Sequence, residues 1–139
     1  MGTGYFTQPS LCADRIVFVC EDDLWEVDSS GGQARRLTNS RSEIKTPYLD
    51  PSGKWIACCA KEEGDPDVYL MSAGGGPLKR LTWLNSVTRI VGWTPDGSSI
   101  LFHSIHQAVH HRGSDAWLFK VGVDGGPVQR LPFGPAVSL

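Results

Sequence analysis

The 139-residue chain lacks the features that mark most helical, membrane-spanning or nucleic-acid-binding proteins. No window of helical length has apolar residues at intervals of three and four, so we expect almost no helix. No apolar run approaches the ~20 residues that span a bilayer, and residues 1–9 lack the basic and apolar start of a secretory signal. A formal net charge of −2 provides no basic stripe for nucleic acid and no polybasic patch for a membrane. We therefore expect neither partner and a cytoplasmic location.

Motifs for metal binding and catalysis are also missing. There is no Cys-x-x-Cys pair among the four cysteines, which are Cys12, Cys20, Cys58 and Cys59. The adjacent Cys58 and Cys59 would point to opposite faces of a strand, so they are poorly placed to share a metal, and we expect buried, reduced thiols. No nucleophile elbow, phosphate-binding loop or dinucleotide fingerprint occurs. The sequence predicts no cofactor and no catalytic residue in this chain.

The sequence does contain one phrase three times. Its copies are GGQARRLT at 31–38, GGPLKRLT at 75–82 and GGPVQRLP at 125–132, at spacings of 44 and 50 residues. Two short apolar runs precede each copy. The first run lies at 16–19, 56–59 and 100–103, and we align the second as 23–27, 67–71 and 115–119. Such runs, bounded by turn residues, are typical of β-strands, and their repetition indicates a repeat architecture.

Each module is predicted to be a four-stranded antiparallel meander. In the second module we expect the strands at about 46–49, 55–59, 68–71 and 78–81, with the glycine pair in the last hairpin. Pro51-Ser52-Gly53 and Pro95-Asp96-Gly97 are typical of tight turns, because proline presets φ and glycine tolerates a positive φ.

A repeated meander of ~40–50 residues is the blade of a β-propeller, an all-β fold. We assign blades to about 5–38, 44–82 and 88–132 of a single domain, 1–139, and the start of a further blade to 133–139.

Two residue types recur with the repeat. Aromatic residues at 25, 69 and 117 are interpreted as packing between neighbouring blades, in preference to ligand stacking. Asp23, Asp67 and Asp115 are interpreted as structural hydrogen-bonding groups at the start of a strand, in preference to general acids or calcium ligands. Both interpretations depend on recurrence at one repeat position.

All four histidines fall within nine residues, at His103, His106, His110 and His111. Neutral imidazoles bind zinc or copper, so His106, His110 and His111 are weak candidates for metal ligands. We favour a second interpretation, a variable loop between two strands, because insertions in repeat proteins map to loops.

The ordered series of phrases resembles the N-terminal propeller of tricorn protease and its bacterial homologues. The matching segments, from about Tyr5 to the last residue, are 16–25, 31–38, 51–57, 91–97 and 130–136. The resemblance implies a large cytosolic serine peptidase that degrades oligopeptides, in which a six-bladed propeller acts as a substrate and product channel or as a scaffold. The family's catalytic Ser and His lie in a C-terminal half that is not part of this sequence. No catalytic role can therefore be assigned to any residue here.

Three modules would form half of a six-bladed ring, so we expect a partial propeller that is marginally stable or associates when alone. The resemblance implies as partners the remaining propeller and peptidase domains, peptides, and further copies of the full-length protein. An alternative is a TolB-like propeller that binds other proteins. Residues proposed to face a channel or partner are Arg41, Glu43, Asn85, Arg89, His106, His110, His111 and Arg112.

Overall fold

The computed structural model describes residues 7–39, 41–105 and 116–132, and every regular element in them is a strand. The first sheet contains β1 (Thr7–Cys12), β2 (Arg15–Cys20), β3 (Asp23–Asp28) and β4 (Arg35–Arg36). The second contains β5 (Glu43–Leu49), β6 (Trp55–Lys61), β7 (Asp67–Ser72) and β8 (Lys79–Arg80). The third contains β9 (Thr88–Trp93), β10 (Ser99–Ser104), β11 (Trp117–Gly122) and β12 (Gly125–Arg130). The described part of the chain has no helix that could cross a membrane.

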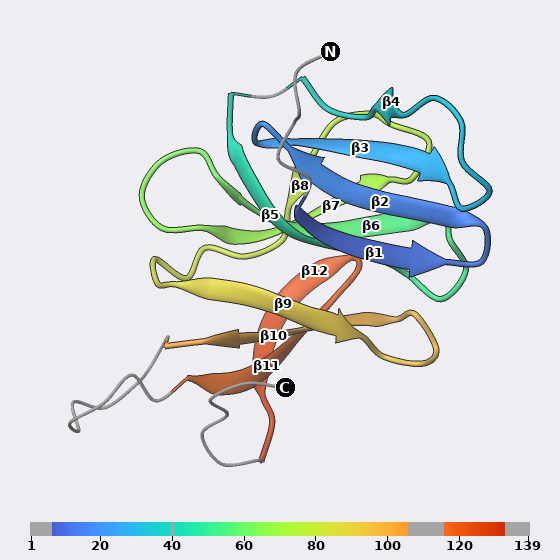
Figure 1. The fold of residues 1–139 in the computed structure, drawn as a ribbon. Helices are drawn as coiled ribbons and strands as arrows, with labels where there is room; N and C mark the ends of the chain where they lie inside the picture. Colours follow the sequence, from blue (N-terminus) through green and yellow to red (C-terminus); the bar gives the residue numbers. More distant parts are fainter. Residues whose placement is uncertain (1–6, 40, 106–115, 133–139) are drawn as a thin grey trace.

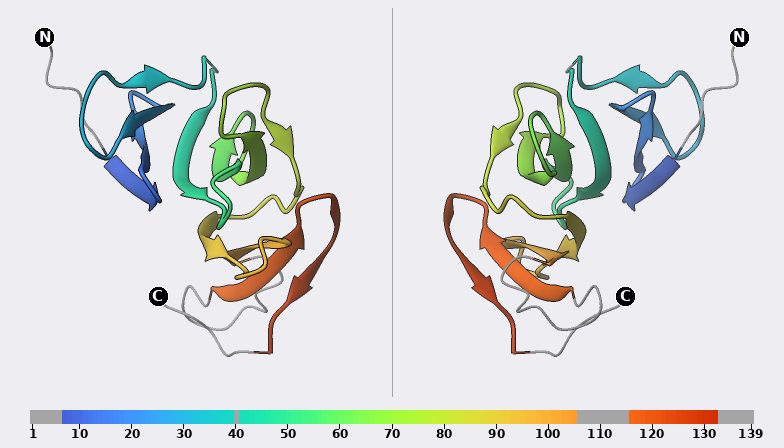
Figure 2. Two further views of the ribbon diagram at one scale, coloured as in Figure 1. Left: turned by 90° about the vertical axis from the view of Figure 1, so that its right-hand side faces the viewer. Right: turned by 90° about the vertical axis from the view of Figure 1, so that its left-hand side faces the viewer.

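Each sheet is an antiparallel meander in which strands adjacent in sequence pair side by side. The sheets follow one another in an arc, with their first strands β1, β5 and β9 in contact along the inner side (Figures 1 and 2). The predicted all-β fold of three four-stranded blades in an open, partial propeller is confirmed. The expected start of a further blade, 133–139, lies outside the described residues.

Two apolar cores join the three sheets. The central strands of the second sheet supply both, because successive side chains point to opposite faces. Cys58 is buried against the first sheet and Cys59 against the third, as the sequence predicts. Tyr69, 3% exposed, packs in the first core as expected. The second sheet is therefore covered on both faces, whereas the first and third sheets each have one face that no described sheet covers.

The turns follow the predicted chemistry with one change. The amides of Gly53 and Gly97 donate to the carbonyls three residues earlier at 2.9 Å, and both glycines have φ near +70° (72° and 71°). The repeated glycine pair, by contrast, does not occupy the centre of its hairpin. The central turn residues are the two that precede it, and the Gly31 and Gly75 amides close the turn at 3.0 Å.

The repeated Arg-Leu-Thr segment binds the aspartate that begins the third strand. In the first sheet the Thr38 hydroxyl donates to Asp23 at 2.6 Å and accepts from the Leu24 amide at 2.9 Å, while Arg36 forms an ion pair with the same carboxylate. These contacts tie the fourth strand to the third beyond the two-residue ladder of β4. The predicted role of this aspartate in hydrogen bonding at the start of the strand is confirmed.

The second sheet repeats this arrangement with more complete burial. Asp67, 1% exposed, accepts from the Thr82 hydroxyl at 2.7 Å, from the Leu84 amide at 2.9 Å and from Arg80 at 2.6 Å. The Thr82 hydroxyl in turn accepts from the Val68 amide at 3.0 Å. We call Asp67, Arg80 and Thr82 the aspartate clamp, a name that also covers Asp23, Arg36 and Thr38 in the first sheet.

The third sheet has a cation–π contact in place of the aspartate clamp. Its strand register also shows that our alignment of 115–119 with 23–27 is wrong by two residues. Phe119 pairs with Arg130 as Trp25 pairs with Arg36, so Trp117 occupies the position of the clamp aspartate. The Arg130 guanidinium lies over the Trp117 ring, 4.4 Å from its centroid, in a cation–π contact. Pro132, which has no hydroxyl, stands where the other copies have threonine. Asp115 lies outside the described residues.

The corrected alignment also changes the interpretation of the repeated aromatic residues. Phe119, 2% exposed and stacked on Phe102, is the counterpart of Tyr69 in the second core. Trp117 packs against the edge of that core and is only partly buried. Trp25 belongs to neither core; it lies on the outer face of the first sheet, opposite to Leu24, where no described sheet packs on it.

Candidate functional site

The inner strands are joined by side chains at one repeated position. Gln8 and Thr46, each followed by proline, have left-handed backbones with φ of 54° and 49°, and the strand register shifts at both places. The Thr46 amide donates to the Gln8 side-chain carbonyl at 2.6 Å, and the Ile90 amide donates to the Thr46 hydroxyl at 3.4 Å. The first and second sheets each supply an acceptor to the first strand of the sheet that follows.

A groove of about 420 Å³ lies across these inner strands, beside the connections that lead into β5 and β9. Strands from all three sheets contribute to it, together with the loop between β6 and β7. Its lining residues are Gln8, Glu43, Lys45, Thr46, Cys59, Lys61, Asp65, Pro66, Val87, Thr88 and Arg89. We call this hollow the inner groove.

The charges of the inner groove are mixed, with a small basic excess of three cations over two carboxylates. Lys45 forms an ion pair with Glu43, and its hydrogen bond and charge, with a smaller contribution from Lys61, hold the pKa of Glu43 below its usual value. Arg89 is exposed and forms no ion pair with the described residues. Arg89 of β9 pairs with His103 of β10. Burial, and to a smaller extent the charge of Arg89, lower the pKa of His103.

The structure brings together only part of the predicted set of partner-facing residues. Glu43 and Arg89, from different sheets, line the same groove. Arg41 and Asn85 are exposed on the connections but are not among its lining residues. His106, His110, His111 and Arg112, which include the weak metal candidates, lie outside the described residues.

Several lining residues were missed by the sequence analysis, namely Gln8, Lys45 and Thr46 on the inner strands and Lys61 at the end of β6. Their strands were predicted, but the side chains were not assigned to a shared surface. A usable signal was present, because Gln8-Pro9 and Thr46-Pro47 place the same kind of pair at one position of two modules. Proline restricts the residue before it, so a repeated X-Pro pair within a strand indicates an irregular backbone.

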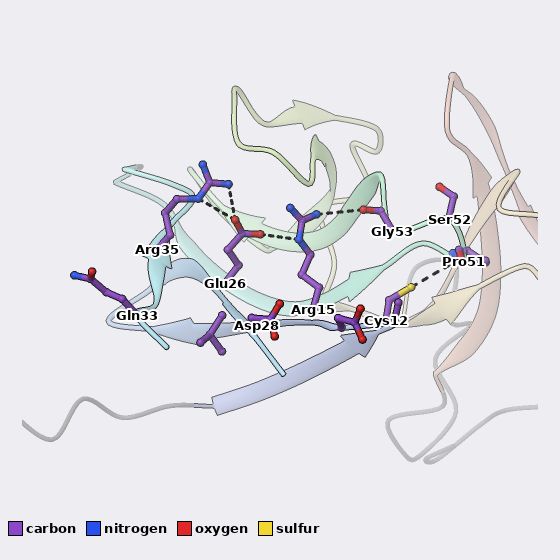
Figure 3. A pocket seen from close by; sticks show the side chains of 12 residues that line it. Cys12, Arg15, Glu26, Asp28, Gln33, Arg35, Pro51, Ser52 and Gly53 are labelled. Carbon is purple, nitrogen blue, oxygen red and sulfur yellow. Dashed lines mark hydrogen bonds and ion pairs between the residues drawn. The ribbon is translucent and has the colours of Figure 1, made fainter. Parts of the chain in front are cut away.

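A larger hollow of about 610 Å³ lies between the first two sheets, beside the turns that end β1 and β5 (Figure 3). Glu26 stands between two guanidinium groups there, with Arg15 at 2.9 Å and Arg35 on its other side. Arg15 also donates to the Gly53 carbonyl at 3.3 Å, and the Cys12 thiol donates to the Asp50 carbonyl at 3.5 Å. The contacts of Arg15 and Cys12 link the two sheets. Glu26, the one lining carboxylate that is not fully exposed, is already paired with the two arginines.

The described residues contain no arrangement suited to nucleophilic or metal-assisted chemistry. No three His, Cys, Asp or Glu side chains gather there at distances suited to a metal. Burial raises the pKa of the Cys58 thiol far above its usual value and that of Cys59 to about 11, so both are held as inert thiols. The inner groove, with its exposed cations, is the candidate surface for binding.

Comparison with known proteins gives the family. The family model described as "Tricorn protease N-terminal beta propeller domain" matches residues 3–139. This chain belongs to the tricorn protease N-terminal propeller family. It is 36% identical over 144 residues to the "Putative tricorn protease homolog 2" of Streptomyces coelicolor, covering 97% of this chain and 12% of that protein. It is 26% identical to the "Putative Tricorn-like protease N-terminal subunit" of Sulfurisphaera tokodaii, covering 98% of this chain and 70% of that protein.

Solved structures agree with the assignment. The crystal structure of tricorn protease superposes with a TM-score of 0.81 and 28% identity over 96% of this chain and 14% of its own. A putative TolB from Agrobacterium tumefaciens, 21% identical, shares the fold with a TM-score of 0.77, over 96% of this chain and 48% of its own. The chain thus spans about one eighth of the tricorn homologue that it matches in sequence.

Proposed function

We propose that this chain is a non-catalytic propeller segment of a serine peptidase that degrades oligopeptides, and that it guides peptides along its inner groove. The family match over residues 3–139 is the observation that carries the proposal. A relative from Sulfurisphaera tokodaii is named as a separate N-terminal subunit of a tricorn-like protease, which supports a scaffold without its own chemistry. The partners would be the peptidase and remaining propeller segments of a cytoplasmic assembly.

The inner groove has the chemistry that an extended peptide requires. A peptide in a channel presents backbone carbonyls and amides along its whole length, and these need partners once water is displaced. Lys45, Lys61 and Arg89 offer donors, whereas Glu43 and Asp65 offer acceptors. Since none of these side chains reads a specific side chain in a closed pocket, the groove suits peptides of varied sequence.

Peptide binding to the inner groove can be measured directly with short fluorescein-labelled peptides of mixed sequence. By fluorescence anisotropy we expect weak binding, and by mass spectrometry no cleavage. Arg89→Ala removes one exposed donor and is expected to raise Kd about fivefold, equivalent to about 1 kcal/mol. Arg41→Ala, an exposed arginine outside the groove, is the matched control and should leave Kd unchanged.

Absence of binding, or equal losses in the two arginine variants, would refute peptide guidance by this groove. A TolB-like binding module is the second candidate, because a TolB from Acinetobacter baumannii is 25% identical over 94% of this chain with a TM-score of 0.75. The adjoining coding sequence separates the two candidates. A second propeller and a serine peptidase core are expected downstream, and a stop codon directly after a single propeller would favour the TolB-like module.

A further inference from the structure

The connection from β8 to β9 exposes large apolar side chains beside the inner groove. Trp83 is 69% exposed and Val87 is 55% exposed on this connection, and Ile105, which follows β10, is 40% exposed. The Ile105 amide donates to the Val87 carbonyl at 3.4 Å, so these two residues are neighbours. The connection and the end of β10 lie on the same side of the sheets as the loop between β6 and β7 (Figure 1). We call Trp83, Val87 and Ile105 the apolar strip.

The equivalent positions one module earlier hold polar or charged residues. At the repeat spacing of 44 residues, the three residues of the apolar strip correspond to Asn39, Glu43 and Lys61. The strand register agrees, because Glu43 pairs with Lys61 across β5 and β6. A single exposed apolar residue is ordinary on a protein surface. Here three apolar residues stand where the same fold accepts three polar ones, so the fold itself does not require the strip.

The connection that carries the strip is anchored. From Trp83 to Arg89 every second residue is exposed, and the residues between them are buried or partly buried. Leu84 packs against the second core, and its amide donates to Asp67 at 2.9 Å. Arg80, which is bound to Asp67, lies over the Trp83 ring at 5.3 Å from its centroid. The exposed side chains are thus held on a fixed backbone, which lowers the entropy that binding must cost.

The apolar strip continues the wall of the inner groove. Val87 lines the groove together with Arg89, two residues later in the chain. The loop between β6 and β7 lines it as well, and Asp67, directly after that loop, binds the amide next to Trp83. The charged lining offers hydrogen bonds to any peptide backbone, whereas the strip offers favourable contact only to apolar side chains. The strip is therefore the part of this surface at which the composition of a peptide matters.

We propose that the apolar strip selects peptides with large aliphatic or aromatic side chains among those that enter the inner groove. This inference rests on the proposed function, because it concerns which peptides the same groove binds. Contact with the strip removes apolar surface of both partners from water, which a serine or glycine side chain cannot match. Because the strip is open, it favours a class of side chains and not a single amino acid.

Two fluorescein-labelled peptides of equal length and charge test the selection. One carries leucine and phenylalanine at two positions where the other carries serine. By fluorescence anisotropy, the apolar peptide is expected to bind about tenfold more tightly, which corresponds to partial burial of its two apolar side chains.

Two variants remove the apolar strip without asking the fold for anything new. Trp83→Asn and Val87→Glu give the second connection the residues that the first connection carries, so both are expected to fold, and circular dichroism checks this. Each is expected to lower the ratio of the two Kd values to about threefold, and the double variant to about one, if the contacts are additive. Because the two peptides have equal charge, the ratio is insensitive to the charge that Val87→Glu adds.

Two controls separate the strip from other effects. Trp55→Ser removes an indole that is 45% exposed at the start of β6 and does not line the groove, so the ratio should stay unchanged. Arg89→Ala removes a donor to the peptide backbone and should weaken both peptides by the same factor.

The outcomes distinguish failure of the selection from failure of the proposed function. Equal binding of the two peptides, a ratio that persists in the double variant, or a ratio that Trp55→Ser lowers as much would overturn the selection, while peptide binding in the groove would stand. If neither peptide binds, the proposed function fails and the selection fails with it.

Discussion

The aspartate clamp of the second sheet gives the most demanding prediction for stability. Asp67→Ala removes an almost fully buried carboxylate that accepts three hydrogen bonds, from Thr82, Leu84 and Arg80. Its loss leaves the Arg80 guanidinium, whose side chain is 29% exposed, without its ion-pair partner. Breaking a buried, hydrogen-bonded charge pair by removing one member costs about 3–5 kcal/mol. This is a large share of the roughly 5–15 kcal/mol that stabilises a typical domain.

Urea unfolding followed by tryptophan fluorescence measures this cost at a fixed protein concentration, since association would change the apparent stability. The matched control is Arg130→Ala in the third sheet, where a cation–π contact replaces the clamp and about 1 kcal/mol is expected. Asp67→Asn retains acceptors for Thr82 and Leu84 and should cost less than Asp67→Ala. A loss below about 1 kcal/mol for Asp67→Ala, or one equal to that of Arg130→Ala, would refute the reasoning.

Two further predictions follow from the pKa values of other groups. In the folded protein at mildly alkaline pH, iodoacetamide should alkylate the partly exposed Cys12. Cys58 and Cys59 should react only after unfolding, because burial keeps both thiols protonated. Mass spectrometry that finds Cys58 modified as fast as Cys12 would contradict this. Hydrogen bonds from Thr94 and then Ser98 lower the pKa of Asp96 from 3.8 to about 2, so its contribution to stability is complete above 3.8 and is lost as pH falls through about 2. Urea unfolding across this acid range should therefore show a shallower pH dependence in Asp96→Asn, and an unchanged slope would disprove the assignment.

The strands and turns could be predicted because the repeated phrases encode local contacts. The Arg-Leu-Thr segment recurs because each copy ties the fourth strand to the third, and the Pro-x-Gly segments recur because each closes a turn. The error in the third module arose from matching residue types. Asp23 and Asp67 lie eight residues before the first glycine of their phrases, and Trp117, not Asp115, lies at that spacing in the third copy.

The candidate site was less predictable because it is formed by three sheets together. Arg89 and Glu43 were expected to face a shared channel or partner. The residues predicted with them, Arg41 and Asn85, lie on connecting loops and not on the strands that line the groove. The backbone irregularities at Gln8 and Thr46 change where their side chains point, so strict alternation along a strand could not place them. Which face of a strand meets another sheet is a tertiary property, so the sequence pattern could not distinguish Trp25, which no described sheet covers, from Tyr69, which packs in the first core.

The links between inner strands give the arc a direction. The Gln8 side chain accepts a hydrogen bond from the amide of Thr46, and the Thr46 side chain accepts one from the amide of Ile90. The aliphatic side chain of Ile90 has no acceptor for the amide of a following inner strand. The three modules are therefore not interchangeable cassettes, even though they share one phrase and one meander. A chain engineered with its second and third modules in exchanged order would place Ile90 where Thr46 is needed, and its inner strands would lose a connection although every sheet remained intact.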